Sequence, residues 1–168
     1  MAYEQHIQSG SAIVARCAII TLSDTRGEAD DKSGSRIKSL LSNQKHEIAF
    51  YQILPDDPQK LDLLLSQLIG RNDIDAILTN GGTGVSKRDQ TIEVIERQLT
   101  LLLPGFGELF RMLSYQQIGS GAMLSRAIGG IAKDKLLFAM PGSTKAVELA
   151  MTRLILPELG HLLGELRK

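Results

Sequence analysis

Short continuous apolar runs recur along the chain, and most of them end in polar or glycine-rich residues. Runs of this kind are typical of strands in a parallel sheet, because helices cover both faces of such a sheet. The last two runs are joined by Lys133-Asp134 and suit a hairpin. The predicted strands are residues 13–22, 47–54, 74–78, 126–132 and 135–140.

Between these runs, apolar residues recur with helical spacing. In residues 58–69, four leucines follow the i, i+3, i+4, i+7 pattern of one helix face, and Pro58 suits a first helical turn. The other predicted helices are residues 33–44, a segment through Ile92, Ile95 and Leu99, residues 106–117 after a break at Pro104-Gly105, and a segment from Ser143 until Pro157 interrupts it.

The alternation of strands and helices predicts the fold class. It favours a three-layer α/β sandwich with a mostly parallel sheet, in which the hairpin supplies one antiparallel edge. A length of 168 residues suits one domain. We therefore expect a flexible tail at residues 1–12 and a single domain over residues 13–168.

Composition limits the partners and the compartment. Lys plus Arg and Asp plus Glu both number 19, so no net field steers the chain onto nucleic acid or an anionic membrane. No apolar run approaches the ~18 residues of a membrane span, and the N-terminus lacks the pattern of a signal peptide, so we expect a cytoplasmic protein. Cys17, the single cysteine, lies in an apolar run and is predicted to be a core residue rather than a catalytic thiol.

Four strand ends carry polar or glycine-rich residues. Ligands of an open parallel sheet bind beyond the carboxyl ends of its strands, so these segments are expected to converge on one rim. They are Thr21-Leu22-Ser23-Asp24, Pro55-Asp56-Asp57, Asn80-Gly81-Gly82-Thr83-Gly84 and Pro141-Gly142-Ser143.

The segment TNGGTGVSKRDQT, residues 79–91, places three glycines within four residues just before a predicted helix. Glycines let backbone amides approach an anion closely, and the helix start behind them adds a favourable dipole. The segment matches neither GxxxxGK[ST] nor GxGxxG, because Lys87 stands where the third glycine would be. From spacing alone, phosphate binding and a plain strand-to-helix turn stay open as alternatives.

The aspartates near this loop also allow two interpretations. Asp56 and Asp89 on one rim beside a phosphate loop would suit a magnesium–nucleotide site, since hard cations prefer oxygen ligands. A helix N-cap at Asp89 or Thr91 would explain the same residues without any function. Similarly, Asp30 and Asp31 suit a solvated surface turn, with Ser33 capping the next helix.

Several separated motifs, in this order, make the chain resemble the MoaB/MogA family of molybdenum cofactor biosynthesis proteins, the molybdopterin adenylyltransferase group, and MoaB in particular. The resemblance covers residues 13–156. The motifs are TLSD at 21–24, GEADDKSG at 27–34, LPDD at 54–57, TNGGTGVSKRDQT at 79–91, PGFGELFR at 104–111, LSRAIGG at 124–130 and MPGSTK at 140–145.

The resemblance implies a Rossmann-like, molybdopterin-binding fold and assembly into a homo-oligomer, a trimer or a hexamer. It also implies an enzyme, a nucleotidyltransferase, in which the terminal phosphate of molybdopterin attacks the α-phosphate of ATP and pyrophosphate leaves. ATP and molybdopterin are then the substrates and Mg²⁺ the cofactor. A molybdenum insertase would receive the product.

The resemblance further implies roles for individual residues. Asp56 and Asp89 would be the catalytic carboxylates and would hold Mg²⁺ through ATP. Asn80 departs from the family, which often has a second threonine there, a change that affects hydrogen bonding more than role. The implied substrate-binding residues are Ser23, Asp24, Asp31, Ser33, Gly34, Asn80, Gly81, Gly82, Thr83, Gly84, Arg88, Thr91, Ser125, Arg126, Pro141, Gly142 and Ser143.

Two other functions stay open at this point. Some family members resemble the adenylyltransferase without clearly catalysing that step, so a non-catalytic molybdopterin carrier or scaffold fits the same loops. The presence of Arg88, Asp89 and Thr91 favours catalysis. Metal insertion belongs to a related fold in a longer, multidomain protein, and a chain of 168 residues argues against it.

Overall fold

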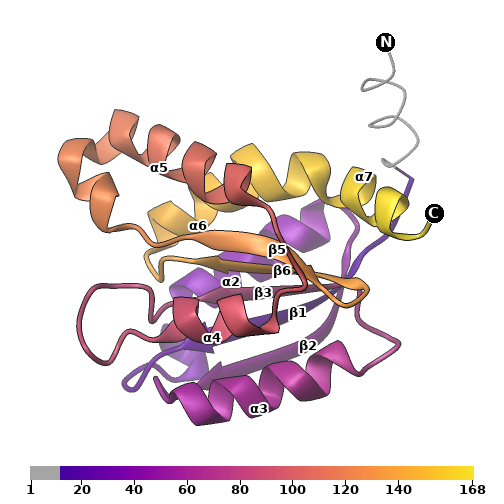
Figure 1. Cartoon of the computed structure of the whole chain (residues 1–168), viewed down its shortest axis with the longest axis horizontal. Helices are drawn as coiled ribbons and strands as arrows, with labels where there is room; N and C mark the ends of the chain where they lie inside the picture. Colours follow the sequence, from indigo (N-terminus) through magenta and orange to yellow (C-terminus); the bar gives the residue numbers. More distant parts are fainter. Residues whose placement is uncertain (1–11) are drawn as a thin grey trace.

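The computed structural model describes residues 12–168, which form one six-stranded sheet with helices on both faces (Figure 1). The predicted tail lies outside the described residues except for Ala12. The strand order is β2-β1-β3-β6-β5-β4. The strands are β1 (Arg16–Leu22), β2 (Glu47–Leu54), β3 (Ala76–Asn80), β4 (Leu101–Leu102), β5 (Ile128–Ala132) and β6 (Lys135–Met140).

The sheet is mostly parallel, as predicted. Strands β2, β1, β3 and β6 are parallel neighbours, and β5 pairs antiparallel with both β6 and β4. The antiparallel strand is therefore next to the edge, because the two-residue strand β4 covers its outer side. The hairpin between β5 and β6 is confirmed, and its turn holds Lys133 at φ 63°, the left-handed conformation that tight hairpin turns use.

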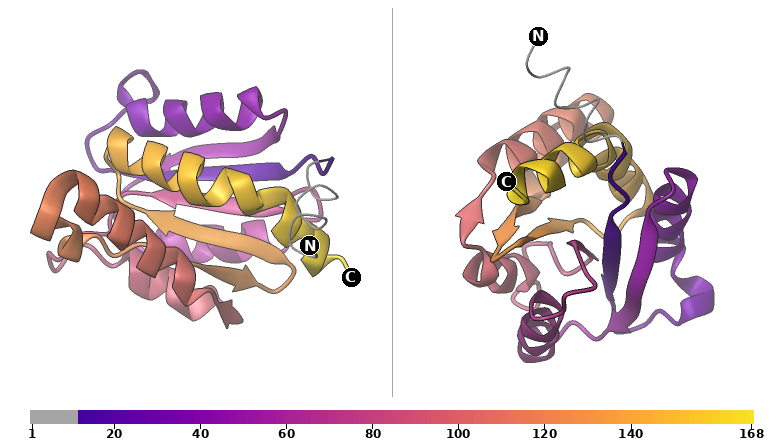
Figure 2. Two further views of the ribbon diagram at one scale, coloured as in Figure 1. Left: turned by 90° about the horizontal axis from the view of Figure 1, so that it is seen from above. Right: turned by 90° about the vertical axis from the view of Figure 1, so that its right-hand side faces the viewer.

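Helices cover both faces of the sheet and complete three layers. Helices α2, α5, α6 and α7 lie on one face, and α3 and α4 lie on the other (Figures 1 and 2). The helices are the 3₁₀ turn η1 (Glu28–Asp30), α2 (Lys32–Asn43), α3 (Pro58–Ile69), α4 (Thr91–Gln98), α5 (Pro104–Ile118), the 3₁₀ segment η2 (Gly119–Leu124), α6 (Thr144–Ala150), the π segment η3 (Met151–Ile155) and α7 (Leu156–Leu166).

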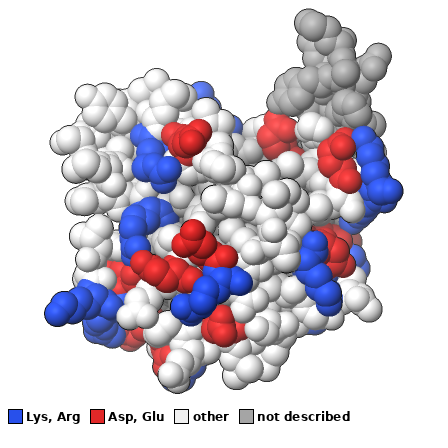
Figure 3. All heavy atoms as spheres, viewed as in Figure 1, with Lys and Arg blue, Asp and Glu red and all other residues white. Residues whose placement is uncertain are grey.

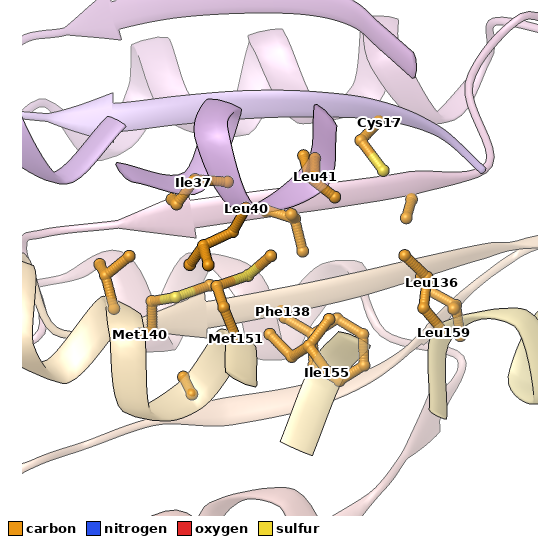
Figure 4. Close-up of a cluster of buried hydrophobic side chains, with 14 of the residues drawn as sticks. Cys17, Ile37, Leu40, Leu41, Leu136, Phe138, Met140, Met151, Ile155 and Leu159 are labelled. Atoms are coloured by element: carbon orange, nitrogen blue, oxygen red, sulfur yellow. The ribbon is translucent and has the colours of Figure 1, made fainter. Parts of the chain in front are cut away.

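Two apolar cores hold the layers together. Successive residues of β1 point to opposite faces, so Ile19 packs in the core under α2 and α6, whereas Ile20 packs in the core against α3 and α4. Cys17 is fully buried on the α2 side and lies beside Leu41 (Figure 4). Its burial confirms the prediction of a core cysteine, and the same burial raises the pKa of its thiol to about 12.

Some element boundaries differ from the predicted ones. Strand β1 begins at Arg16 rather than at residue 13, and β3 ends at Asn80. Pro157 does not end the helix after Ser143, because the π segment η3 leads directly into α7 with the proline at the second position of α7. A π segment of this kind is a local widening within a longer helix. Within residues 12–168, no helix is long and apolar enough to cross a membrane.

Candidate functional site

The loops that follow β1, β2, β3 and β6 meet at one rim of the sheet, on the left in Figure 1, and border a cavity of about 520 Å³. This convergence is the one that the strand ends predict. The lining residues are Leu22, Ser23, Asp24, Thr25, Arg26, Asp56, Gly81, Gly82, Thr83, Gly84, Asp89, Leu124, Ser125, Pro141 and Gly142.

The glycine loop after β3 needs its glycines for conformation and for space. Gly81 has φ 98° and Gly82 has φ 62°, both in the left-handed region that favours glycine. A Cβ on Gly81 would lie 2.3 Å from the carbonyl oxygen of Leu22. A Cβ on Gly82 would lie 2.1 Å from Thr91 Oγ1 and 2.5 Å from Asp56 Oδ1. The backbone therefore passes directly against the carboxylate of Asp56.

Two amides of this loop are open. The amide of Gly81 donates to the carbonyl of Met140 at 3.1 Å, and the amide of Gly84 faces the carboxylate of Asp89. In the part of the chain that the structure describes, the amides of Gly82 and Thr83 make no hydrogen bond. Consecutive amides next to a left-handed residue form a concavity that binds anions. This feature favours phosphate binding over a plain turn.

Three carboxylates border the same cavity, those of Asp24, Asp56 and Asp89. Burial raises the pKa of Asp56, and the neighbouring carboxylates of Asp89 and Asp24 raise it further. The pKa of Asp89 is lowered, chiefly because its Oδ2 accepts hydrogen bonds from the Ser86 hydroxyl at 2.6 Å and the Ser86 amide at 3.0 Å. The unfavourable charge on Asp56 is of the kind that a bound cation relieves.

These carboxylates fit Mg²⁺ in chemistry but do not form a metal site by themselves. Mg²⁺ prefers oxygen ligands and usually takes only one or two of them from protein carboxylates, with phosphate oxygens and water for the rest. Among residues 12–168, no group of three or more His, Cys, Asp or Glu side chains could hold a metal ion. A magnesium ion at Asp56 and Asp89 would therefore need oxygens from a bound phosphate.

The interpretation of Asp89 or Thr91 as the N-cap of α4 is wrong. The cap position belongs to Gln90, and no side chain accepts a capping hydrogen bond there. The Asp89 carboxylate turns back to Ser86, inside its own loop. Thr91 is buried at the first position of α4, and its amide donates to the carbonyl of Gly82 at 3.2 Å. Both residues thus shape the glycine loop.

The interpretation of Asp30 and Asp31 as a solvated surface turn holds for the exposed Asp30 but is wrong for Asp31. Asp31 is 1% exposed, and it rather than Ser33 is the N-cap of α2, accepting from the amide of Gly34 at 2.9 Å. Its Oδ2 also accepts from the hydroxyls of Thr21 and Tyr51, each at 2.7 Å. Burial opposes ionisation, but these hydrogen bonds outweigh it and lower the pKa of Asp31.

Asn80 extends this buried network from β3 to β1 and α2. Ser33 Oγ lies 2.8 Å from Asn80 Oδ1, and Asn80 Nδ2 donates to Thr21 Oγ1 at 2.9 Å. Gly34 belongs to the same cluster, since a Cβ there would lie 2.1 Å from an oxygen of Asp31. These residues lie behind the cavity and fix the strand ends that form it, and none of them lines it.

The arginines of the site have different partners. Arg88 forms an ion pair with Asp24, and Arg126 binds backbone carbonyls of the glycine loop. Arg26 lines the cavity, and its Nη1 donates to Ser33 Oγ at 3.0 Å and to the carbonyl of Gly142 at 3.3 Å. Sequence reasoning did not single out Arg26, although it follows Asp24 by two residues in the same loop.

Charge is mixed over this side of the molecule. On the face seen in Figure 3, acidic and basic side chains alternate and no field of one sign appears.

Ser143 caps α6 by accepting from the amide of Ala146 at 3.1 Å. The predicted site residues that do not line the cavity are Asp31, Ser33, Gly34, Asn80, Arg88, Thr91, Arg126 and Ser143.

Comparison with known proteins places the chain among close relatives. It is 50% identical over 169 residues to molybdenum cofactor biosynthesis protein B of Halalkalibacterium halodurans, covering 100% of this chain and 99% of that protein. A crystal structure of a molybdenum cofactor biosynthesis protein B matches with a TM-score of 0.90 and 51% identity, covering 92% of this chain and 97% of the other. The crystal structure of the tungsten cofactor synthesizing protein MoaB from Pyrococcus furiosus matches with a TM-score of 0.83 and 35% identity, covering 92% of this chain and 98% of the other.

The family model described as a probable molybdopterin binding domain matches residues 18–161, a span that includes all four loops of the rim. The structural matches reproduce the sheet and the helices that position these loops. The chain therefore belongs to the molybdopterin-binding domain family that contains the MoaB and MogA proteins.

Proposed function

We propose that the protein acts in molybdenum cofactor biosynthesis by binding molybdopterin and adenylylating it with Mg-ATP, with release of pyrophosphate. The open amides of Gly82 and Thr83 carry this proposal, because they lie in a glycine loop that passes between the carboxylates of Asp56 and Asp89. The names of the relatives support the pathway. The adenylylation step rests on the geometry of the site.

The chain's own groups would position the reacting phosphates. The amides of Gly82 and Thr83 would bind phosphate oxygens, and Arg26 would add a positive charge from the opposite loop. A phosphate oxygen of molybdopterin would bond to the α-phosphorus of ATP while the bond to the bridging oxygen breaks and pyrophosphate leaves. Such transfers depend on positioning and on neutralising charge more than on covalent help from the protein.

Asp56 and Asp89 would hold Mg²⁺ together with the phosphates. Bound Mg²⁺ would supply charge neutralisation at the phosphate oxygens. The Asp56 carboxylate is suited to this role because two neighbouring carboxylates disfavour its charge when no cation is near. The Asp89 carboxylate is held in place by Ser86 and is ionised well below neutral pH.

Pyrophosphate release from Mg-ATP, measured with and without molybdopterin, tests the proposal. We expect pterin-dependent release in the wild type and a loss of about a hundredfold or more in Asp56→Asn and Asp89→Asn. Asp73→Asn is the matched control, because Asp73 is an exposed carboxylate that pairs with Arg71 and does not line the cavity. Release at the wild-type rate by Asp89→Asn would remove Asp89 from the mechanism.

A non-catalytic molybdopterin carrier is the second candidate. One observation favours it, since Arg88 is already paired with Asp24 and does not line the cavity. Binding of molybdopterin without any ATP-dependent product would identify the carrier. In either case, transfer of the bound pterin to a molybdenum insertase is part of the proposal.

We also propose that the protein is a homo-oligomer, a trimer or a hexamer. Helix α5 buries Phe106 and Phe110, but on its other side Met112, Tyr115 and Ile118 are 52%, 64% and 61% exposed. Large exposed apolar patches on globular proteins commonly mark contact surfaces. Light scattering at micromolar concentration should give an oligomer mass that falls in Met112→Glu, whereas a wild-type monomer mass would contradict the proposal.

A further inference from the structure

The guanidinium of Arg126 binds both ends of the segment that carries Asp89. Its Nε donates to the carbonyl of Gly84 at 2.9 Å and lies 3.3 Å from that of Thr83. Its Nη2 donates to the carbonyl of Asp89 at 2.5 Å. One planar group therefore connects the end of the glycine loop to the residue that precedes helix α4 by two positions.

The remaining nitrogen of this guanidinium is also occupied. Nη1 pairs with Glu93 Oε1 of α4 at 2.5 Å, and the Arg126 side chain is 28% exposed. All three nitrogens thus have partners within the protein, and Arg126 does not line the cavity bordered by Gly82 and Asp89. These contacts give Arg126 a role within the protein in addition to the substrate-binding role that the family resemblance implies.

The contacts to Thr83 and Gly84 have consequences for the amides of the loop. In a trans peptide the carbonyl and the following N–H point in opposite directions. Holding the Thr83 carbonyl on the Arg126 side directs the amide of Gly84 toward the carboxylate of Asp89, as observed. The same guanidinium fixes the backbone of Asp89 from behind. Arg126 therefore fixes the backbone on both sides of this segment, and Ser86 orients the Asp89 carboxylate that the backbone carries.

We propose that Arg126 is a positioning residue, which fixes the glycine loop and Asp89 in the arrangement that binds phosphate and Mg²⁺. This role rests on the proposed adenylyltransferase function. Lysine cannot replace arginine here, because a single ammonium group cannot reach Gly84, Asp89 and Glu93 with the geometry of a planar fork.

The test compares Arg126→Lys with Arg71→Lys. Arg71 makes a bidentate hydrogen-bonded contact with Asp73, at 2.9 and 2.7 Å, and neither residue lines the cavity. Arg71→Lys therefore controls for the general effect of replacing a bidentate arginine on stability and cleavage. Lys87 and Arg88 are exposed, lie between the two contacts of Arg126 at Gly84 and Asp89, and provide a trypsin site. We expect trypsin to cleave there about tenfold faster in Arg126→Lys, because local opening exposes the segment, and at the wild-type rate in Arg71→Lys.

Kinetics then separate positioning from local stability. We expect kcat for pyrophosphate release to fall about a hundredfold in Arg126→Lys, as displacement of a catalytic group by about 1 Å can cause, with KM for molybdopterin little changed. Glu93→Gln leaves the backbone contacts of Arg126 in place and should give a smaller rise in cleavage, which keeps the test usable if Arg126→Lys folds poorly.

Each result decides the proposal. If trypsin cleaves Arg126→Lys at the wild-type rate, Arg126 does not hold residues 84–89 in place, and the proposal is overturned whatever the enzyme assay shows. Faster cleavage with unchanged kcat would overturn the positioning role and leave a structural contact. If the wild type binds molybdopterin but releases no pyrophosphate, the adenylyltransferase function fails. Faster cleavage of Arg126→Lys would then still show that Arg126 holds residues 84–89 in place.

Discussion

Replacement of Gly82 by alanine is the most direct test of the close approach between the glycine loop and Asp56. An alanine at φ 62° costs about 1–2 kcal/mol because its Cβ is too close to the following carbonyl. The same Cβ would lie 2.1 Å from the Oγ1 of the buried Thr91, and overpacking of this kind costs about 1–3 kcal/mol. We expect the free energy of unfolding to fall by about 2–5 kcal/mol.

The substitution should also reduce activity by more than it reduces stability. The Cβ would lie 2.5 Å from Asp56 Oδ1, so that carboxylate must withdraw by about 0.9 Å to reach the ordinary contact distance of 3.4 Å. A displacement of this size in a reacting site costs about a hundredfold in rate. Urea unfolding followed by circular dichroism gives the first quantity, and pyrophosphate release at a temperature where the variant is folded gives the second.

The control for Gly82→Ala is Gly105→Ala. Gly105 lies in the first turn of α5, and no atom lies within 4 Å of a Cβ placed there. This change should leave activity intact and leave the free energy of unfolding unchanged or raise it by up to about 1 kcal/mol. Wild-type stability and activity in Gly82→Ala would refute the close approach of Gly82 to Asp56 and Thr91.

Three further predictions concern stability and thiol reactivity. Burial would raise the pKa of Asp75, yet hydrogen bonds from Arg16 and Arg167 hold it at about 2, below the ordinary range of an aspartate. A depressed pKa stabilises the folded state above pH ~4, so Asp75→Asn should lower the free energy of unfolding by about 2 kcal/mol at pH 7, and urea titrations should show this difference shrinking between pH ~4 and ~2. Because burial raises the pKa of Cys17 to about 12, alkylation by iodoacetamide at pH 8 should occur only at the rate of unfolding, and rapid labelling of the folded protein would contradict its burial. Ser143→Ala removes the N-cap of α6 and should lower the free energy of unfolding in urea by about 1 kcal/mol. An unchanged free energy would show that the cap does not contribute to stability.

The sequence predicts the sheet and its ligand-binding edge because those signals are local. Strands β1, β3 and β6 are buried along nearly their whole length and therefore read as unbroken apolar runs. The glycine loop is visible for a similar reason, since its left-handed residues must be glycine. The strand order could not be predicted, because an apolar run does not indicate which strands pair with it.

The roles of individual polar residues could not be predicted because they depend on distant partners. In the sequence, Asp31 stands in a charged segment typical of a surface loop. In the fold, the hydroxyls of Tyr51, 20 residues away, and Thr21, 10 residues away, donate to its carboxylate. Arg126 binds carbonyls 42 and 37 residues earlier in the chain. Backbone carbonyls leave no trace in a sequence pattern, so family resemblance offered only a substrate contact for this residue.

The cavity is lined by the four rim loops and by Leu124 and Ser125, so its residues are spread between Leu22 and Gly142. No fragment of the chain contains the whole cavity, and it exists only after the central strands have paired. A ligand that contacts several of these loops therefore acts as a cross-link across the entire sheet. At a concentration of 100 times its Kd, such a ligand would add about 2.7 kcal/mol to the free energy of global unfolding, so substrate supply would govern how long the folded protein survives proteolysis.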